Sequence, residues 1–327
     1  MPISVDTMIM LWERLFWPLL RLICALSLGL LIANFIEALN WTRKIAILAR
    51  PLVKVGNMSD VTGASFSMAV FSGVSANTLL AEAYDQQRIS RRELVLANLF
   101  NSLPTFFVHL PTMFLITFPL IKGAAIIYVG LTLCAALLRT FTIIFVSRFL
   151  LPNPVRESGK VLDDEVDTGI DWRNAFDKSW KRFKKRIRKI LYITVPIYIV
   201  IFFMIRIGYF RELEQFVAGY LTFIPWLSPQ AMGIITLQMA AELTGGVAAA
   251  GALLQEGVMS NREVILALLV GNVLSSPLRA VRHQFPYYAG IFKPKIAMEL
   301  IVCSQAFRII SLIVMGTVYF FLTVPVG

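Results

Sequence analysis

Charged residues are scarce in this sequence. Asp, Glu, Lys and Arg make up only 16% of its 327 residues, whereas soluble domains carry about 25%. Hydrophobic residues make up 57%, and the apolar runs at 15–39, 190–208 and 296–323 reach the ~20 residues that a membrane-spanning helix requires. No strand-length alternation competes with these runs. We therefore predict an all-α polytopic integral membrane protein.

Cysteine and histidine are also rare. Cys24, Cys134 and Cys303 lie inside apolar runs without CxxC spacing, which argues against a disulfide framework and a zinc site. The sequence contains no nucleophile elbow, HExxH motif, phosphate-binding loop or dinucleotide fingerprint. We therefore expect a protein that is not an enzyme and uses no cofactor or metal. An intramembrane enzyme that uses His109 and His283 remains the minority alternative.

The net charge of +11 comes largely from short basic stretches beside apolar segments. These stretches lie at 43–54, 86–92 and 173–189. Because they flank membrane segments, we expect them to set orientation rather than to bind nucleic acid.

The last basic stretch has a helical apolar stripe. Its members recur at steps of four and three: Trp172, Phe176, Trp180, Phe183, Ile187 and Ile190. Lys and Arg occupy the remaining faces, so we predict an interfacial helix that binds anionic lipids over 172–190. A regulatory protein-binding helix is the alternative.

Two halves of the chain resemble each other at a displacement of about 170 residues. ISRRELVLA (89–97) recurs as MSNREVILA (259–267), and LCAALLR recurs as VCSQAFR, which aligns Arg139 with Arg308. We predict a first membrane repeat at 1–150, a cytosolic connector at 151–189 and a second membrane repeat at 190–327.

The distribution of Lys and Arg predicts the orientation of the repeats. The basic connector is expected in the cytosol, so the last helix of the first repeat runs inward. No Lys or Arg follows Arg308, so the last helix of the second repeat is expected to run outward. The repeats are then inverted, which requires an odd number of crossings and a re-entrant hairpin in each. Four full crossings in each half would make them parallel instead.

Small residues and prolines recur in corresponding positions of the two halves and predict broken helices. The segments are 61–83 and 231–254, each followed by a Pro-containing segment at 93–119 or 261–290. Discontinuous helices in matching positions mark the binding sites of secondary transporters.

Glu242 lies in the stretch AELTGGVAAAG, at 241–251. An acidic residue at membrane depth costs at least ~2.5 kcal/mol on insertion scales and usually meets a cation, proton or substrate. We predict that Glu242 binds the coupling ion or the solute. The alternatives are that Glu242 pairs with an arginine for assembly alone and that the glycines only pack helices. The predicted neighbours at the site are Thr244, Gly245 and Gly246, with Ser75 and Asn77 from the first half.

A second polar group surrounds Pro277. Its members are Asn272, Ser276, Arg279, Arg282 and His283, and the first half contributes Asn101 and His109. Arginine's planar fork suits carboxylate or phosphate, so this group could hold an anionic or hydrogen-bond-rich solute. The alternatives are that the arginines face the cytosolic interface and that the histidines are buried structural groups.

Arg139 and Arg308 fall mid-helix in both halves. Arginines inside a membrane need partners, and the available carboxylates are Glu242, Glu82 and Glu37. We predict gating or structural ion pairs, with Glu242 alternating between an arginine and the coupling cation.

The sequence resembles the Gate, or nucleoside-recognition, family of membrane domains. This family includes concentrative nucleoside transporters, the membrane domain of the ferrous-iron transporter and spore maturation proteins. The resembling pieces are FSGVSANTLLAEAYDQQRISRREL (71–94) and ELTGGVAAAGALLQEGVMSNREV (242–264). The resemblance implies an inverted-repeat core with a substrate site at two hairpins. On this chain the matching positions are Gly73, Ser75, Asn77, Glu242, Thr244, Gly245 and Gly246.

These observations together predict a secondary transporter of the bacterial inner membrane that works by alternating access. Its expected partners are a small polar solute, anionic or nucleoside-like, and a coupling cation or proton; a homodimer is left open. The alternative function is a non-transporting scaffold or receptor that recruits a partner through the basic connector.

Overall fold

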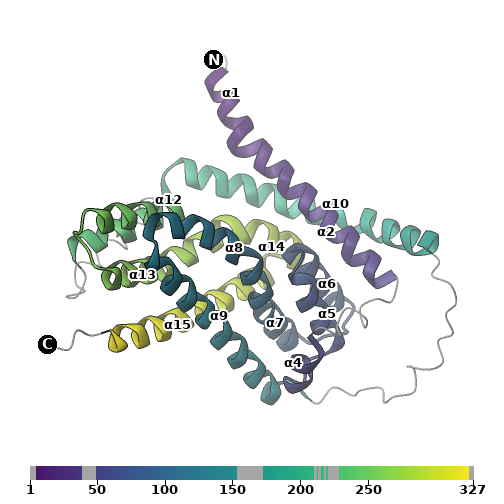
Figure 1. Cartoon of the computed structure of the whole chain (residues 1–327). Coiled ribbons are helices and arrows are strands. Elements are labelled where there is room, and N and C mark those ends of the chain that lie inside the picture. Colours follow the sequence, from purple (N-terminus) through teal and green to yellow (C-terminus); the bar gives the residue numbers. More distant parts are fainter. Residues whose placement is uncertain are drawn as a thin grey trace. The chain divides into compact units, whose positions relative to one another are not determined.

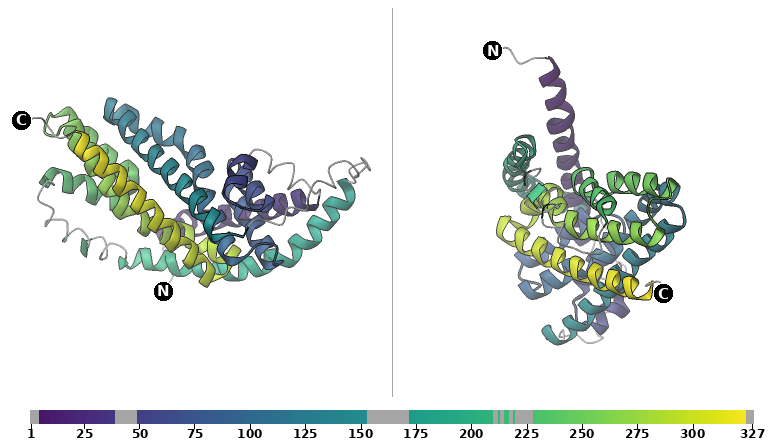
Figure 2. Two further views of the ribbon diagram at one scale, coloured as in Figure 1. Left: turned by 90° about the horizontal axis from the view of Figure 1, so that it is seen from below. Right: turned by 90° about the vertical axis from the view of Figure 1, so that its left-hand side faces the viewer.

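The computed structural model describes residues 5–38, 49–152, 172–209, 212, 215–216, 219 and 228–323. Every regular element among these residues is a helix (Figures 1 and 2). Six helical stretches are long and apolar enough to cross a membrane: Met8–Ile32, Arg91–Ile121, Gly123–Leu150, Pro229–Gln255, Asn261–Phe292 and Pro294–Leu322. The prediction of an all-α, multi-pass membrane protein is confirmed.

The helices of the first half are α1 (Val5–Leu11), η1 (Trp12–Phe16), α2 (Trp17–Ala38), α4 (Arg50–Val55), α5 (Asp60–Ala69), α6 (Gly73–Asp85), α7 (Arg91–Phe100), α8 (Ser102–Ile121) and α9 (Gly123–Leu150). Those that follow are α10 (Trp172–Arg206), α12 (Pro229–Gln255), α13 (Asn261–Arg279), η3 (Ala280–Gln284), α14 (Phe285–Phe292) and α15 (Pro294–Leu322). The elements η1 and η3 are π-helical turns.

Several local features recur at the displacement that relates the two halves. Lys122 and Lys293 have positive φ angles, 45° and 69°, immediately before the long helices α9 and α15. Gln87 and Gly257 have positive φ angles, 59° and 69°, in the turns before α7 and α13. These recurring backbone angles agree with the sequence repeat, while the inverted orientation of the halves stays a prediction.

The small-residue segments are interrupted at corresponding points. Helix α5 ends at Ala69 and α6 begins at Gly73, while α12 has non-helical angles at Ala241 and Glu242. With 10 and 13 residues, α5 and α6 are about 15 and 20 Å long, which is shorter than the ~30 Å hydrocarbon core. The re-entrant hairpin, predicted from each small-residue segment and the front of the next helix, stays a prediction.

Prolines lie both inside the helices that follow and beside their interruptions. Pro111 and Pro119 lie inside α8, and Pro277 lies inside α13. The first of these segments breaks at Asn101 instead, between α7 and α8. Pro104 lies in the first turn of α8, directly after this break, and the π-helical turn η3 begins three residues after Pro277. The interruptions thus lie near prolines, while Pro111 and Pro119 are tolerated inside the helix.

The chain forms two compact units, which are described separately. Unit 1 comprises Met1–Thr105, Thr140–Tyr198 and Tyr287–Leu300, and unit 2 comprises Phe106–Arg139, Ile199–Pro286 and Ile301–Gly327. Each unit draws on both sequence halves. The division into repeats at 1–150 and 190–327 stays a prediction about sequence and topology.

In unit 1 the connector helix packs against α2. Leu26, Leu30 and Ile190 form one buried cluster, and Phe183 and Ile187 pack on it. Helix α10 therefore uses the carboxyl-terminal part of its apolar stripe within the protein. It also runs without interruption across the predicted boundary between connector and second repeat.

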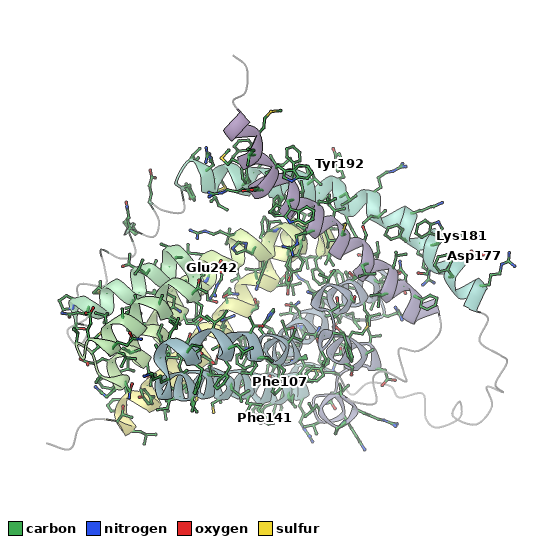
Figure 3. The ribbon with its side chains drawn as sticks, turned by 45° about the horizontal axis from the view of Figure 1, so that its top comes forward. Phe107, Phe141, Asp177, Lys181, Tyr192 and Glu242 are labelled. Atoms are coloured by element: carbon green, nitrogen blue, oxygen red, sulfur yellow. The ribbon has the colours of Figure 1, made fainter. Side chains whose placement is uncertain are left out.

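The amino-terminal part of the stripe is exposed. Phe176 and Trp180 are 56% and 39% exposed, and the Lys184 ammonium lies 5.4 Å from the centre of the Trp180 ring. Asp177 and Lys181 come from the same helix (Figure 3). Lipid binding by this end of α10 stays a prediction, and connector residues 153–171 lie outside the described residues.

The core of unit 2 is built around α12 and α13, which lie side by side (Figures 1 and 2). Ile234, Ile235 and Leu268 are fully buried there, together with Tyr128 of α9. Close packing also requires glycine at position 251, because an added Cβ on Gly251 would lie 2.9 Å from the carbonyl oxygen of Leu120.

Candidate functional site

Helix α12 is broken at Glu242, a residue that Figure 3 labels. Ala241 has φ −117° and ψ 21°, and Glu242 has φ 59° and ψ −159°. The Glu242 angles fall in a region of backbone conformation that is essentially restricted to glycine and costs of order 1–3 kcal/mol for other residues. The Thr244 hydroxyl donates to the carbonyl oxygen of Ala241 at 3.2 Å, so it satisfies one acceptor next to the break.

The twin glycines pack against earlier turns of their own helix. A Cβ on Gly245 would lie 2.6 Å from the Ala241 Cβ, and a Cβ on Gly246 would lie 2.6 Å from the Gln238 Cβ. On a regular helix, side chains four apart, like Ala241 and Gly245, have Cβ atoms about 5–6 Å apart. Positions eight apart, like Gln238 and Gly246, are separated by about 12 Å along the axis, so the break brings these turns unusually close. The observed role of the glycines is close packing; solute contact at these two positions stays a prediction.

The carboxylate of Glu242 contacts His283. Its Oε1 lies 3.0 Å from the His283 Nε2, and the two side chains are 49% and 60% exposed. His283 belongs to η3, the π-helical turn that continues α13. Wide turns of this kind occur frequently at functional sites. The structure thus brings together two predicted site residues that are 41 positions apart.

Arg308 does not pair with Glu242. Its Nη2 donates to the Asn272 Oδ1 at 3.2 Å, and the Asn272 Nδ2 donates to the Tyr128 hydroxyl at 3.1 Å. The expected ion pair between Glu242 and this arginine is absent from the described residues, because Glu242 is paired with His283 and Arg308 faces an amide. Arg139 is 9% exposed, and its expected gating role stays a prediction.

Gln238 inserts between α12 and α13 and was missed by the sequence analysis. With its amide oriented to match its neighbours, Nε2 donates to the carbonyl oxygen of Leu268 and Oε1 accepts from the Asn272 backbone N–H, both at 3.2 Å. Gly271 makes this approach possible, since a Cβ there would collide with the Gln238 side chain. The sequence signal was a single glutamine in an apolar segment. In the structure the Gln238 side chain is 1% exposed.

Further polar residues of the Pro277 group point to α15. The Ser276 hydroxyl donates to the Gln305 Oε1 at 2.6 Å. The Ser275 hydroxyl is buried and has no partner among the described residues. Arg279 and Arg282 are partly exposed, while His109 is exposed on α8.

Asn77 and Asn101, two predicted site residues of the first half, lie in unit 1 and make uncharged hydrogen bonds. The Asn98 Nδ2 donates to the Asn77 Oδ1 at 3.0 Å and lies 3.2 Å from the Tyr288 hydroxyl. The Asn101 Nδ2 donates to the Ser65 hydroxyl at 2.6 Å. Amide side chains dominate here.

Ser75 is also buried in unit 1. Its hydroxyl donates to the Ser72 hydroxyl at 3.0 Å, and its backbone N–H donates to the same oxygen at 3.2 Å. Ser72 caps the amino terminus of α6 in this way. Ser75 therefore helps to fix the beginning of the helix that follows the interruption.

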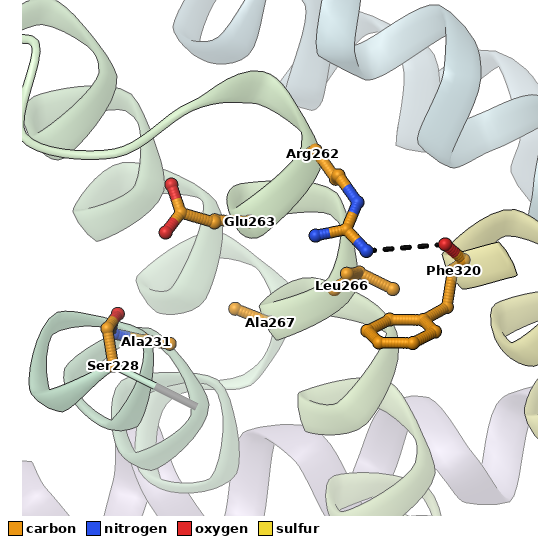
Figure 4. Close-up of a pocket in the computed structure, with 7 residues that line it drawn as sticks. All are labelled: Ser228, Ala231, Arg262, Glu263, Leu266, Ala267 and Phe320. Atoms are coloured by element: carbon orange, nitrogen blue, oxygen red, sulfur yellow. Dashed lines mark hydrogen bonds between the residues drawn. The ribbon is translucent and has the colours of Figure 1, made fainter. Parts of the chain in front are cut away.

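A small cavity lies elsewhere in unit 2 (Figure 4). Its volume is about 90 Å³, and its lining includes Arg262, Glu263 and Phe320. The Arg262 Nη2 donates to the carbonyl oxygen of Phe320 at 3.2 Å. Ligand pockets usually measure about 300–1,000 Å³, and none of the predicted site residues lines this cavity, so we do not assign the solute to it.

No group of three or more His, Cys, Asp or Glu side chains suited to a metal ion occurs among the described residues. The ionisable groups brought together at the break of α12 are one carboxylate and one imidazole. A carboxylate and an imidazole can bind a proton between them, and the carboxylate can bind a monovalent cation.

Sequence comparison finds relatives of unknown activity. The chain is 26% identical to Uncharacterized protein MJ0871 of Methanocaldococcus jannaschii, over 85% of this chain and 86% of that protein. It is 24% identical to Uncharacterized protein MJ1556 of the same organism, over 94% and 95%, and 21% identical to Uncharacterized protein MJ0880, over 84% and 88%. No family model matches the chain, and no solved structure matches it.

Proposed function

We propose that the protein is a secondary transporter that moves a small polar solute across a cytoplasmic membrane, such as the bacterial inner membrane, by alternating access. One observation carries the proposal: a membrane-length helix is broken at Glu242, whose carboxylate contacts an imidazole on a π-helical turn. Broken membrane helices and intramembrane acids are features of transport pathways. The resemblance to nucleoside-recognition domains supports the same function.

The chemistry of the pair suggests how coupling would work. A proton or cation on Glu242 weakens its attraction to His283, which frees the imidazole and the adjoining π-helical turn. The break supplies a hinge at the same residue, because two consecutive residues already have non-helical backbone angles. A ligand that binds better to one arrangement of the hinge shifts the population toward it.

Uptake into proteoliposomes tests the proposal. Candidate nucleosides and organic anions are supplied outside vesicles that carry a proton or sodium gradient. We expect gradient-driven uptake by the natural protein and its loss in Glu242→Gln. The matched control is Glu256→Gln, which removes an exposed carboxylate from the carboxyl-terminal end of the same helix and should leave uptake unchanged. Equal uptake by both variants would remove Glu242 from the coupling mechanism.

A second candidate function rests on the exposed end of α10. Phe176 and Trp180 present aromatic surface beside exposed Lys181 and Lys184, as a helix that recruits an anionic partner would. A scaffold or receptor predicts that Lys181→Glu with Lys184→Glu abolishes the cellular function while Glu242→Ala leaves it intact. A transporter predicts the opposite pattern.

A further inference from the structure

Two polar helix faces meet in the interior of unit 2. Asn272, Ser275, Ser276 and Arg279 follow one another on α13 at positions i, i+3, i+4 and i+7, so they share one face of that helix. On α15, Gln305 and Arg308 are separated by three positions and also share a face.

Two hydrogen bonds join these faces. The Arg308 Nη2 donates to the Asn272 side chain, and the Ser276 hydroxyl donates to the Gln305 side chain. The two contacts hold the two helix faces together at two successive turns. Arg279 follows on α13, one turn beyond Ser275.

Arg279 and Arg308 carry positive charge that no carboxylate of the described residues pairs with. Arg279 and Arg139 lie close enough to Arg308 for their charges to repel it. The acid of α12, Glu242, pairs with an imidazole. Adjacent cations within an apolar element require a counter-charge.

Hydrogen-bond donors also exceed acceptors here. A guanidinium has five N–H donors and no acceptor, and the one protein acceptor that Arg308 contacts among the described residues is Asn272. Ser275, 4% exposed, adds a buried hydroxyl without a partner in the described part of the chain. The Ser275 hydroxyl is thus a buried donor without an acceptor, which is costly. Arg279 and Arg308 are partly exposed, so their other N–H groups can meet a ligand, and both the charge and the donors favour an anion.

We propose that unit 2 binds a small anion whose carboxylate or phosphate oxygens accept hydrogen bonds from Arg308 and Arg279, with Ser275 as a further donor. The planar fork of arginine matches either group. The inference rests on the proposed transport function to the extent that it names the solute class: a charged organic acid or phosphate compound rather than a neutral nucleoside. Binding itself does not require transport.

Thermal unfolding of the purified full-length protein in detergent measures the binding. Inorganic phosphate, succinate and uridine are titrated separately, with sodium chloride holding the ionic strength constant. We expect Tm to rise with the concentration of phosphate or succinate and not with uridine. The response to phosphate against that to succinate distinguishes the two anion chemistries.

The variants decide whether the arginines form the site. Arg308→Gln should raise the half-saturating anion concentration at least tenfold, and Arg308→Lys should give an intermediate value because it keeps the charge but loses the fork. Arg206→Gln is the matched control, since Arg206 is exposed at the end of α10. This control should respond to the anion as the natural protein does.

If Arg308→Gln does not fold, Ser275→Ala provides the second test. It should weaken anion binding several-fold while leaving the Tm without ligand unchanged or higher, because it removes a hydroxyl that lacks a partner. Stabilisation by uridine alone, or an equal anion response in every variant, would overturn the inference. Anion binding without uptake would sustain the site and refute transport; uptake of uridine with no anion response would do the reverse.

Discussion

The break at Glu242 predicts an unusual ranking of stability between two substitutions. Glu242→Gly and Glu242→Ala both remove the carboxylate and its contact with His283, so that loss cancels between them. They differ in how they tolerate φ 59° and ψ −159° at this position. Alanine retains a backbone strain of about 1–3 kcal/mol, whereas glycine relieves it at an entropic cost of about 0.5–1 kcal/mol.

We therefore expect Glu242→Gly to be more stable than Glu242→Ala by about 1 kcal/mol, the difference between these two effects. In a regular helix the ranking would be reversed, since glycine costs about 1 kcal/mol relative to alanine. The sign of the difference thus reports the local backbone. The measurement is the free energy of unfolding in mixed micelles titrated with denaturing detergent.

A control within the same helix calibrates the assay. Ala248 is exposed and lies in the helical part of α12 after the break, so Ala248→Gly should lose about 1 kcal/mol. The reasoning fails if Glu242→Ala equals or exceeds Glu242→Gly in stability while this control behaves as expected.

Three further predictions concern packing and surface charge. Gly271→Ala should destabilise the protein by about 1–2 kcal/mol, because the added Cβ displaces the buried Gln238 amide, a loss that outweighs the gain in helix propensity. In a Gln238→Ala background the same change should be neutral or stabilising. Unfolding free energies in a double-mutant cycle measure both effects. Gly251→Ala should lower the Tm, since its Cβ would lie 2.9 Å from the backbone oxygen of Leu120, which cannot rotate away. Arg91→Gln should leave the stability nearly unchanged in the same assay, because the exposed ion pair it removes is solvated.

The sequence was sufficient to predict the fold class and the region of the broken helices. Apolar runs of sufficient length indicate membrane helices, and small residues beside Glu242 indicated an interruption in α12. The residue that carries the positive φ could not be assigned, because glycine is the usual occupant of such a position and two glycines lie nearby. In the structure Gly245 and Gly246 are packed against earlier turns of α12, while Glu242 has the unusual angles.

The pairing of side chains was less predictable. Arg308 was expected to meet a carboxylate because charge balance is the usual rule for membrane arginines. The observed partner of Arg308 is Asn272. Glu242 contacts His283, which lies in a π-helical turn. The hydrophobic periodicity of the sequence does not reveal such a turn. The role of Gln238 could not be predicted for a similar reason, because it depends on the close approach of two helices at Gly271.

The interruption of α12 also divides its electrostatic dipole. Each half-helix carries partial charges of roughly +0.5 at its amino end and −0.5 at its carboxyl end, so opposite ends face each other at Ala241 and Glu242. These partial charges belong to the peptide groups and do not titrate. Straightening the helix would merge the two dipoles and remove both charges from the middle of the apolar element, so the local shape and the local field must change together.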